Sequence, residues 1–306
     1  MKKLALLALP ILLLSACKKT ETIHIVCPTG APAFAFYKYG NDSNFETNSK
    51  PKNIVSMMTK SSDKQVVVID TVSGVQAIKN GAPYKLAATL TFGNFFIAST
   101  GKDNNDTMDP GDKIILFGKG TTPDLLFHYL YGNTYDEGIE YVDAVQDAVP
   151  CLVSGKNSVT QSEIKYVFIA QPVLLNALSK NANAKKYVDV QEAYKEKSGG
   201  KKLIQASIFV KNGTGSRALN KVLYDVQDDV TAALENPEVI SETLSYLSAD
   251  DAVAKYGVAP AMAVNALKDN NGLGLGFQKS LEIKADIDAF LKDVQNLEAT
   301  SEEIYY

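Results

Sequence analysis

The sequence has few of the side chains on which most enzymes and nucleic-acid-binding proteins depend. Its 306 residues include no tryptophan, two histidines and three cysteines, and Arg217 is the single arginine among thirty-one basic residues. Neither His24 nor His128 has a histidine or cysteine four residues away, so no metal pair is indicated. No Walker loop, nucleophile elbow or dinucleotide fingerprint is present. We therefore expect no metal and no cofactor. Because the basic residues form no patch, we also expect no nucleic-acid partner.

Long hydrophobic runs are also scarce, and the longest lies at the N-terminus. Two lysines precede an eleven-residue apolar run, Leu4 to Leu14, which is shorter than the roughly 20 residues of a membrane-spanning helix. The run ends in Leu-Ser-Ala-Cys, which looks like the lipobox of bacterial lipoproteins, with Cys17 as the acylated residue. We therefore expect a lipoprotein signal peptide at 1–16 and a lipidated tether at 17–22, which anchors the protein to the extracytoplasmic face of the cell membrane. An ordinary cleaved signal peptide is the alternative.

The remaining cysteines do not suggest a disulfide framework. Beyond Cys17 only Cys27 and Cys151 remain, and they fall in segments that we assign to different halves of the protein. We expect two buried, unpaired thiols.

Two segments share one strand–turn–helix pattern. Residues 112–131 contain an apolar run at 114–117, a glycine turn, Pro123 and then apolar residues at helical spacing. Residues 23–39 repeat this pattern, with Pro32 in the place of Pro123. Such turns present backbone N–H groups and the positive end of a helix to a ligand. Two matched units about ninety residues apart predict an α/β protein with two lobes and a ligand cleft between them.

Strands and helices alternate along the rest of the chain. Buried strands are predicted at 23–26, 66–70, 86–90, 95–99, 114–117, 139–142, 165–170, 187–190 and 203–210. Helices are predicted at 74–80, 143–153, 173–180, 216–234, 237–247, 249–256, 260–267 and 280–294. Residues 40–52 and 270–278 are expected to be loops. We assign residues 23–111 and 207–306 to the first lobe and 112–206 to the second, with 101–111 as the linker and 203–210 as the return crossing.

Ligand contacts are expected where the strands end, because open α/β sheets bind ligands beyond the carboxyl ends of their strands. The predicted contacts are Thr29, Gly30, Ala31, Asp70, Thr71, Ser73, Thr91, Phe92, Asn94, Gly120, Thr121, Thr122, Gln171 and Gln205. Three alternatives stay open. Asp70 is also suited to cap a helix, Phe92 is also suited to the core, and glycine turns occur in many α/β proteins without a ligand.

A series of short motifs resembles one family when it is taken in order. The motifs are PTGAPA (28–33), GKGTTPDLLFHYL (118–130), Gln171-Pro172, YKEKSGGKKLIQASIFV (194–210), NPEVI (236–240) and EEIYY (302–306). Together they resemble the solute-binding lipoproteins of bacterial ABC importers, in the branch that handles nitrate, sulfonates and thiamine-pyrimidine precursors. The resemblance implies a two-lobed periplasmic-binding-protein fold of type 2 with two crossing strands. It also implies hinge closure on a small-molecule ligand and docking to importer permease subunits.

Two departures from this family affect the expected ligand. Gln171 stands where relatives usually carry a carboxylate, and Tyr194 stands where they often carry tryptophan. Without an arginine in the cleft, no bidentate clamp on a carboxylate or sulfonate is available. We therefore expect a neutral or weakly charged heterocycle, such as a vitamin precursor. It would be held by backbone N–H groups at Gly30 and 121–122 and by the amides of Asn94, Gln171 and Gln205.

Three other functions stay open. An anion such as a sulfonate, taurine or nitrate would be held by the two helix N-termini together with Lys119. Pyrimidine synthases share the family, but they carry a cluster of cysteines with histidines that this sequence lacks, so we expect no enzyme activity. A membrane-tethered scaffold is the remaining class.

Overall fold

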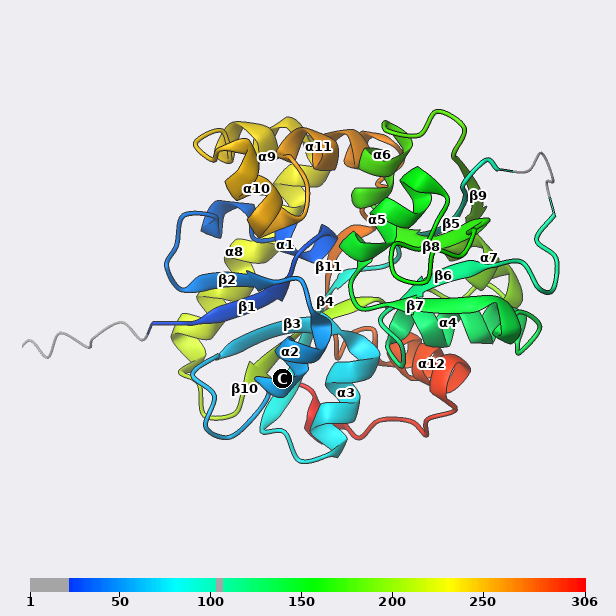
Figure 1. Ribbon diagram of the computed structural model, residues 1–306. Helices are drawn as coiled ribbons and strands as arrows, with labels where there is room; N and C mark the ends of the chain where they lie inside the picture. The colour runs from blue at the N-terminus through cyan, green and yellow to red at the C-terminus, as the bar shows by residue number, and fades with distance from the viewer. Residues whose placement is uncertain (1–21, 103–106) are drawn as a thin grey trace, which may run out of the picture.

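The computed structural model describes residues 22–102 and 107–306, and this part of the chain is built on two β-sheets with helices around them (Figure 1). The predicted signal peptide, the acylated Cys17 and most of the tether lie outside the described residues. Within the described part, no helix is both long and apolar enough to cross a membrane.

The first sheet has six strands in the order β11-β4-β10-β3-β1-β2. Strand β1 runs parallel to β2 and β3, whereas β10 pairs antiparallel with β3 and β4, and β11 antiparallel with β4. The sequence of β3, VVVID, has four buried residues in succession, as expected for a strand that is covered on both faces. The strands are β1 Ile25–Pro28, β2 Phe45–Asn48, β3 Val66–Asp70, β4 Tyr84–Thr91, β10 Ala206–Lys211 and β11 Leu275–Lys279.

The second sheet has five strands in the order β7-β6-β8-β5-β9. Strand β6 runs parallel to β7 and β8, and β5 pairs antiparallel with β8 and β9. The strands are β5 Phe95–Ser99, β6 Ile114–Phe117, β7 Ile139–Val142, β8 Tyr166–Ala170 and β9 Lys185–Asp189. The two sheets therefore share one arrangement, with β1 and β6 as the central parallel strands. This confirms that the two strand–turn–helix units are structural counterparts.

The chain crosses between the sheets earlier than the sequence predicted. Strand β5 was assigned to the first lobe, with the linker at 101–111, but it lies in the second sheet between β8 and β9. The first crossing is therefore the short segment 92–94, where Gly93 has φ of +119°. The prediction was wrong because consecutive strands usually share a sheet, and here β4 and β5 do not. The return crossing precedes β10, as predicted.

Helices cover both sheets. They are α1 Ala31–Phe34, α2 Pro51–Ser56, α3 Thr71–Lys79, α4 Thr122–Tyr131, α5 Val145–Ser154, α6 Val173–Leu178, α7 Val190–Lys197, α8 Ser216–Glu235, α9 Glu238–Thr243, α10 Ala249–Tyr256, α11 Pro260–Lys268 and α12 Lys284–Gln295. Three 3₁₀ turns are η1 Tyr37–Tyr39, η2 Asp136–Gly138 and η3 Glu302–Ile304. The predicted loop 40–52 contains β2, and the end of the predicted loop 270–278 forms most of β11. Both are edge strands with polar or glycine-rich sequences, so neither shows a strand pattern.

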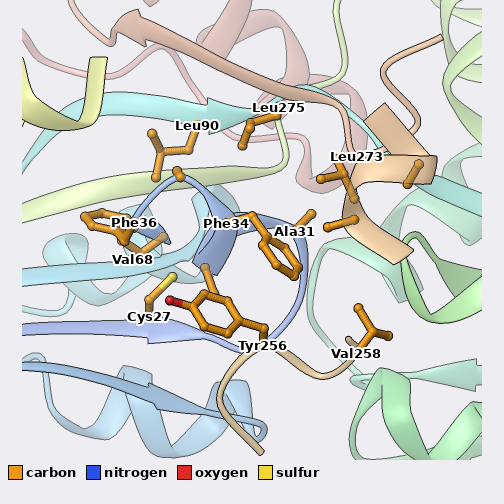
Figure 2. Packing of buried hydrophobic residues seen from close by; sticks show 14 of the residues in the cluster. Cys27, Ala31, Phe34, Phe36, Val68, Leu90, Tyr256, Val258, Leu273 and Leu275 are labelled. Atoms are coloured by element: carbon orange, nitrogen blue, oxygen red, sulfur yellow. The ribbon is translucent and has the colours of Figure 1, made fainter. Parts of the chain in front are cut away.

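The core of the first half forms where β1, α1 and α10 meet (Figure 2). Phe34 stacks on Tyr256 with ring centroids 4.9 Å apart, and Cys27 of β1 lies beside this pair. Cys27 and Cys151 are both buried and unpaired, which confirms the prediction of two free thiols.

The C-terminal helices contact both halves, although the sequence predicted that they pack on the first lobe alone. Helix α11 contacts α6, and α12 contacts α4 of the second half (Figure 1). On α12, Asp293 accepts a hydrogen bond from the Tyr194 hydroxyl at 3.0 Å and forms an ion pair with Lys201 at 2.9 Å. The helical periodicity gives the buried face of α12 but does not identify its partner.

Candidate ligand-binding cleft

A cleft of about 730 Å³, counting its open mouth, lies between the carboxyl ends of the parallel strands of the two sheets. Each of these six strands contributes at least one lining residue at or just beyond its end. They are Thr29, Ser49 and Asp70 after β1, β2 and β3, and Thr121, Gln146 and Gln171 after β6, β7 and β8. The position follows the rule that predicted it.

Eight of the fourteen predicted contact residues line this cleft. They are Thr29, Gly30, Ala31, Asp70, Asn94, Thr121, Gln171 and Gln205. The other six do not line it. They are Thr71, Ser73, Thr91, Phe92, Gly120 and Thr122.

The residues that miss the cleft have structural roles beside it. Thr71 and Thr91 are fully buried and hold β10 in place, since the Thr71 hydroxyl lies 2.7 Å from that of Ser207 and the Thr91 hydroxyl accepts the Ala206 N–H at 3.1 Å. Phe92 lies against Gly276 of β11, which favours the core alternative for this ring. Sequence position alone placed these residues near strand ends but did not show which way each one faces.

Two of the three backbone N–H groups that were expected to hold the ligand are already used within the protein. The Gly30 N–H donates to the Tyr256 carbonyl at 3.1 Å, and the Thr121 N–H donates to the Gly118 carbonyl at 2.9 Å. Neither group is free to bind a ligand. The neighbouring Gly120 N–H donates to Asp124 Oδ2 at 2.7 Å, so this acid in the first turn of α4 occupies the place that an anionic ligand would take.

Lys119, the expected cation for an anionic ligand, does not line the cleft. Its Nζ lies 4.8 Å from the centre of the Tyr141 ring, a cation–π contact on the second half of the molecule. Among the described residues that line the cleft, Asp70 is the single charged one.

Asp70 uses one carboxylate oxygen for structure and has the other oxygen unpaired. Its Oδ1 accepts the Ser73 N–H at 3.0 Å, which caps α3, and the Thr122 hydroxyl at 3.0 Å. Its Oδ2 is buried and has no hydrogen-bond partner in the described protein. Burial raises the pKa of the Asp70 carboxyl above its usual range, and the hydrogen bonds from Ser73 and Thr122 offset this in part.

A short hydrogen-bond network joins the two crossing segments to the backbone of Gln171 at the floor of the cleft. The Asn94 side chain donates to the backbone carbonyl of Gln171 at 3.0 Å and accepts from Gln205 Nε2 at 2.7 Å. The three side chains are almost fully buried. Gln205 Oε1 and Gln171 Nε2 have no partner in the described protein, although both atoms are buried. The network therefore fixes the Asn94 and Gln205 side chains at the floor, where Gln205 and Gln171 each keep one polar atom without a partner.

Two hydrogen bonds connect the halves across the cleft. Gln146 Nε2 donates to Thr29 Oγ1 at 2.9 Å, and the Thr122 hydroxyl donates to Asp70 as described above. Gln146 and Ser49 were missed from the sequence. The signal for Gln146 was available, because it closely follows a predicted strand. Ser49 was hidden because β2 was taken for a loop.

The remaining walls are apolar. The rings of Phe95 and Phe117 lie with their centroids 6.0 Å apart, and Ile69, Val145 and Val173 add aliphatic surface. Apolar walls with a few fixed polar atoms are typical of small-molecule sites.

Comparison with known proteins identifies the fold. No family model and no curated protein matches the sequence. Among solved structures, the chain is similar to an ABC transporter protein from Parabacteroides distasonis, with a TM-score of 0.69 and 15% identity over 92% of this chain and 94% of that one. The fold is that of the periplasmic binding proteins.

Two further structures have the same fold. The alkanesulfonate-binding protein SsuA from Xanthomonas axonopodis pv. citri, bound to MOPS, has a TM-score of 0.61 and 11% identity over 93% of this chain and 97% of that one. A ligand-binding component of an ABC-type import system from Staphylococcus aureus, with zinc bound, has a TM-score of 0.64 and 7% identity over 92% and 95%. Within residues 22–102 and 107–306 of this chain, no group of three or more histidine, cysteine or acidic residues is placed to hold a metal ion.

Proposed function

We propose that this protein is the solute-binding component of an ABC importer, which closes around one small organic solute without transforming it. The observation that carries the proposal is the cleft between the two sheets. Four buried side-chain atoms without a hydrogen-bond partner in the described protein belong to residues that line it. Buried polar atoms in native proteins are almost always paired, so a group of unpaired ones on one cleft favours a ligand as their partner. Known ABC import binding proteins with the same fold support this function.

The N-terminal sequence supports attachment to the outer face of the cell membrane through Cys17. An acylated lipoprotein cysteine carries at least two chains, enough for stable anchoring where a single chain is marginal. The Cys17→Ala variant should leave the detergent phase in a two-phase partition. Wild-type protein that already partitions into the aqueous phase would contradict the anchor and leave solute binding untouched.

The cleft favours a neutral or weakly charged heterocycle, such as a vitamin precursor, over an anion. A sulfonate is the alternative that SsuA suggests. Against it stands the character of the lining, where the described residues include one carboxylate and neither lysine nor arginine. The turn N–H groups that would bind an anion are also occupied.

The titratable groups of the described cleft lining also favour binding without turnover. General acid–base catalysis most often uses histidine, and nucleophilic catalysis uses a side chain that a neighbouring base, a lowered pKa or a metal activates. In the described lining, Asp70 is the one acid, and its neighbours are hydroxyls and amides.

A thermal-shift screen of a metabolite library tests the proposed function. A ligand at ~100 times its dissociation constant stabilises the folded protein by roughly 2.7 kcal/mol, which is a shift of several degrees because ~1 kcal/mol moves the melting temperature by about 2–4 °C. Consumption of a hit by the pure protein would indicate an enzyme. A library without a single hit would contradict solute binding and favour the scaffold.

A further inference from the structure

The unpaired atoms of the cleft have a distinct chemical character. Ten buried side-chain atoms of the described residues have no hydrogen-bond partner, and four of them belong to the cleft lining. Three of these four are oxygens and one is a nitrogen. They are Asp70 Oδ2, Gln146 Oε1, Gln205 Oε1 and Gln171 Nε2. Among these four atoms there are thus three acceptors and one donor.

The hydrogen-bond network fixes the orientation of the two floor glutamines. The Gln171 carbonyl can only accept, so the nitrogen of the Asn94 amide must face it and the Asn94 oxygen must face Gln205. Gln205 therefore donates through Nε2, and its oxygen is the atom without a partner. Gln171 Oε1 accepts the Leu175 N–H at 3.3 Å, which makes Nε2 its unpaired atom. The assignment of the unpaired atoms of Gln205 and Gln171 is therefore not arbitrary, whereas the Thr29 hydroxyl bonds to Gln146 in either orientation of that amide.

The acceptor atoms come from adjacent parts of the backbone. Asp70 is paired in register with Ala206 across β3 and β10, so it lies next to Gln205. The Thr71 N–H, which follows Asp70, donates to the Gln205 carbonyl at 2.8 Å. Gln205 is linked through Asn94 to the backbone carbonyl of Gln171. Asp70, Gln205 and Gln171 all line the same cleft.

The Asp70 carboxylate has no cationic partner in the cleft. Its hydrogen bonds come from the Ser73 N–H and the Thr122 hydroxyl, and no described lining residue is basic. Asp229, another buried carboxylate with one unpaired oxygen, differs because Lys38 lies 2.5 Å from it. Burying a charged group destabilises the protein unless the group is paired with an opposite charge. A positively charged ligand would therefore pair with Asp70 as Lys38 pairs with Asp229.

We infer that the solute is a small organic cation that carries two or more N–H donors on a flat, apolar body, with Asp70 as its counter-ion. This inference rests on the proposed function and names the chemical class of its ligand. The amide oxygens of Gln205 and Gln146 accept the further N–H groups. The Phe95 and Phe117 rings contact the apolar body.

Three compounds of nearly the same shape test the charge of the ligand. Benzamidine is a cation with several N–H donors, benzamide is its neutral analogue and benzoate its anionic one. Titration calorimetry on the wild-type protein should show benzamidine binding at least about tenfold more tightly than benzamide, the usual gain from a charge-assisted pair. Benzoate should not bind.

The Asp70→Asn variant tests the counter-ion directly. Asparagine caps a helix as well as aspartate does and still accepts from Thr122, so the fold should be retained. Benzamidine affinity should fall about tenfold or more, and the preference over benzamide should disappear. The matched control is Asp229→Asn, which removes a buried carboxylate that does not line the cleft. This variant should leave benzamidine binding unchanged.

Any of three results would overturn the inference. They are tighter binding of benzoate or benzamide than of benzamidine, unchanged benzamidine affinity in Asp70→Asn, and no benzamidine binding at about 10 mM. The proposed function would survive each of them if the metabolite screen yielded a neutral or anionic hit. A metabolite screen without hits would contradict the proposed function, which is the binding of a small organic solute.

Discussion

The two halves of the cleft are built on equivalent strands, but the side chains at the ends of these strands differ in charge. In the first half, β3 ends in Asp70, whose carboxylate has one unpaired oxygen. In the second half, its counterpart β8 is followed by Gln171, a neutral amide. Asp124, which follows the glycine turn of the second half, already accepts hydrogen bonds with both carboxylate oxygens. The donors are the Gly120 N–H and the Tyr141 hydroxyl. A shared scaffold thus carries its available negative charge on one side only, and a cationic ligand would bind with its charged end toward the first sheet.

The largest expected effect on stability comes from Gln171→Glu, which gives the second half a carboxylate directly after β8, the counterpart of β3. Gln171 is 1% exposed, so the new carboxylate would be buried without a cationic partner. We expect the free energy of unfolding to fall by roughly 2–4 kcal/mol at pH 8. Burial raises the folded-state pKa of such a group, so the loss should shrink as pH falls toward about 4, where both states bind the proton.

Urea denaturation of the Gln171→Glu variant at pH 8 and pH 4 measures this. Gln146→Glu is the control, because Gln146 is partly exposed and its change should be smaller. Equal stability of Gln171→Glu and wild type at pH 8 would mean that the second half tolerates the same charge as the first.

The next effect concerns the amide network that holds the halves together. Asn94→Ala leaves the Gln171 carbonyl and the Gln205 amide without their partner. Leaving buried groups unpaired costs about 1–3 kcal/mol, which urea denaturation would detect as a lower midpoint with an unchanged slope. A value within about 0.5 kcal/mol of wild type, the range of ordinary surface substitutions, would show that the network does not position the floor.

A smaller effect, of opposite sign, is expected for the stability of Asp70→Asn without ligand. Because burial raises the folded-state pKa of Asp70, the unfolded chain ionises first as pH rises from about 4. Wild type therefore loses stability as pH rises through the folded-state pKa, and the variant lacks this loss. The variant should be more stable than wild type at pH 8 and equal to it at pH 3. A variant that is less stable at both pH values would show that the carboxylate serves the fold rather than a ligand.

The smallest effect is expected at the mouth of the cleft. Thr29→Val removes the hydroxyl that accepts the Gln146 amide N–H and joins the halves, a hydrogen bond worth about 0.5–1.5 kcal/mol. It should appear as a faster dissociation of bound benzamidine, read by stopped-flow displacement. Gln227→Ala, on the exposed side of α8, is the control. Identical dissociation rates in both variants would argue that the Gln146–Thr29 contact does not hold the cleft closed.

Much of this site was predictable because strand ends are local features of the sequence. Strands were predicted before Thr29, Asp70, Thr121, Gln146 and Gln171, so five of the six strand ends that line the cleft were identified and that of β2 was missed. The helix-cap role of Asp70 also followed from its place before a helix. Each of these inferences needs only residues within a few positions of each other.

The rest depends on partners far along the chain. The N–H of Gly30 is taken by Tyr256, more than two hundred positions away, and β5 pairs with β8 and β9 instead of its neighbour β4. No local pattern reports such contacts. Asp124 is the exception, since an acid in the first turn of α4 was visible and should have warned against an anion at that turn.

The crystal structure of the protein with its tightest metabolite hit bound is the most direct test of the account. We predict a cationic ligand between the two sheets, with N–H groups within hydrogen-bond distance of Asp70 Oδ2 and Gln205 Oε1 and an acceptor near Gln171 Nε2. A ligand bound elsewhere, or one that presents a carboxylate or sulfonate to this floor, would contradict it.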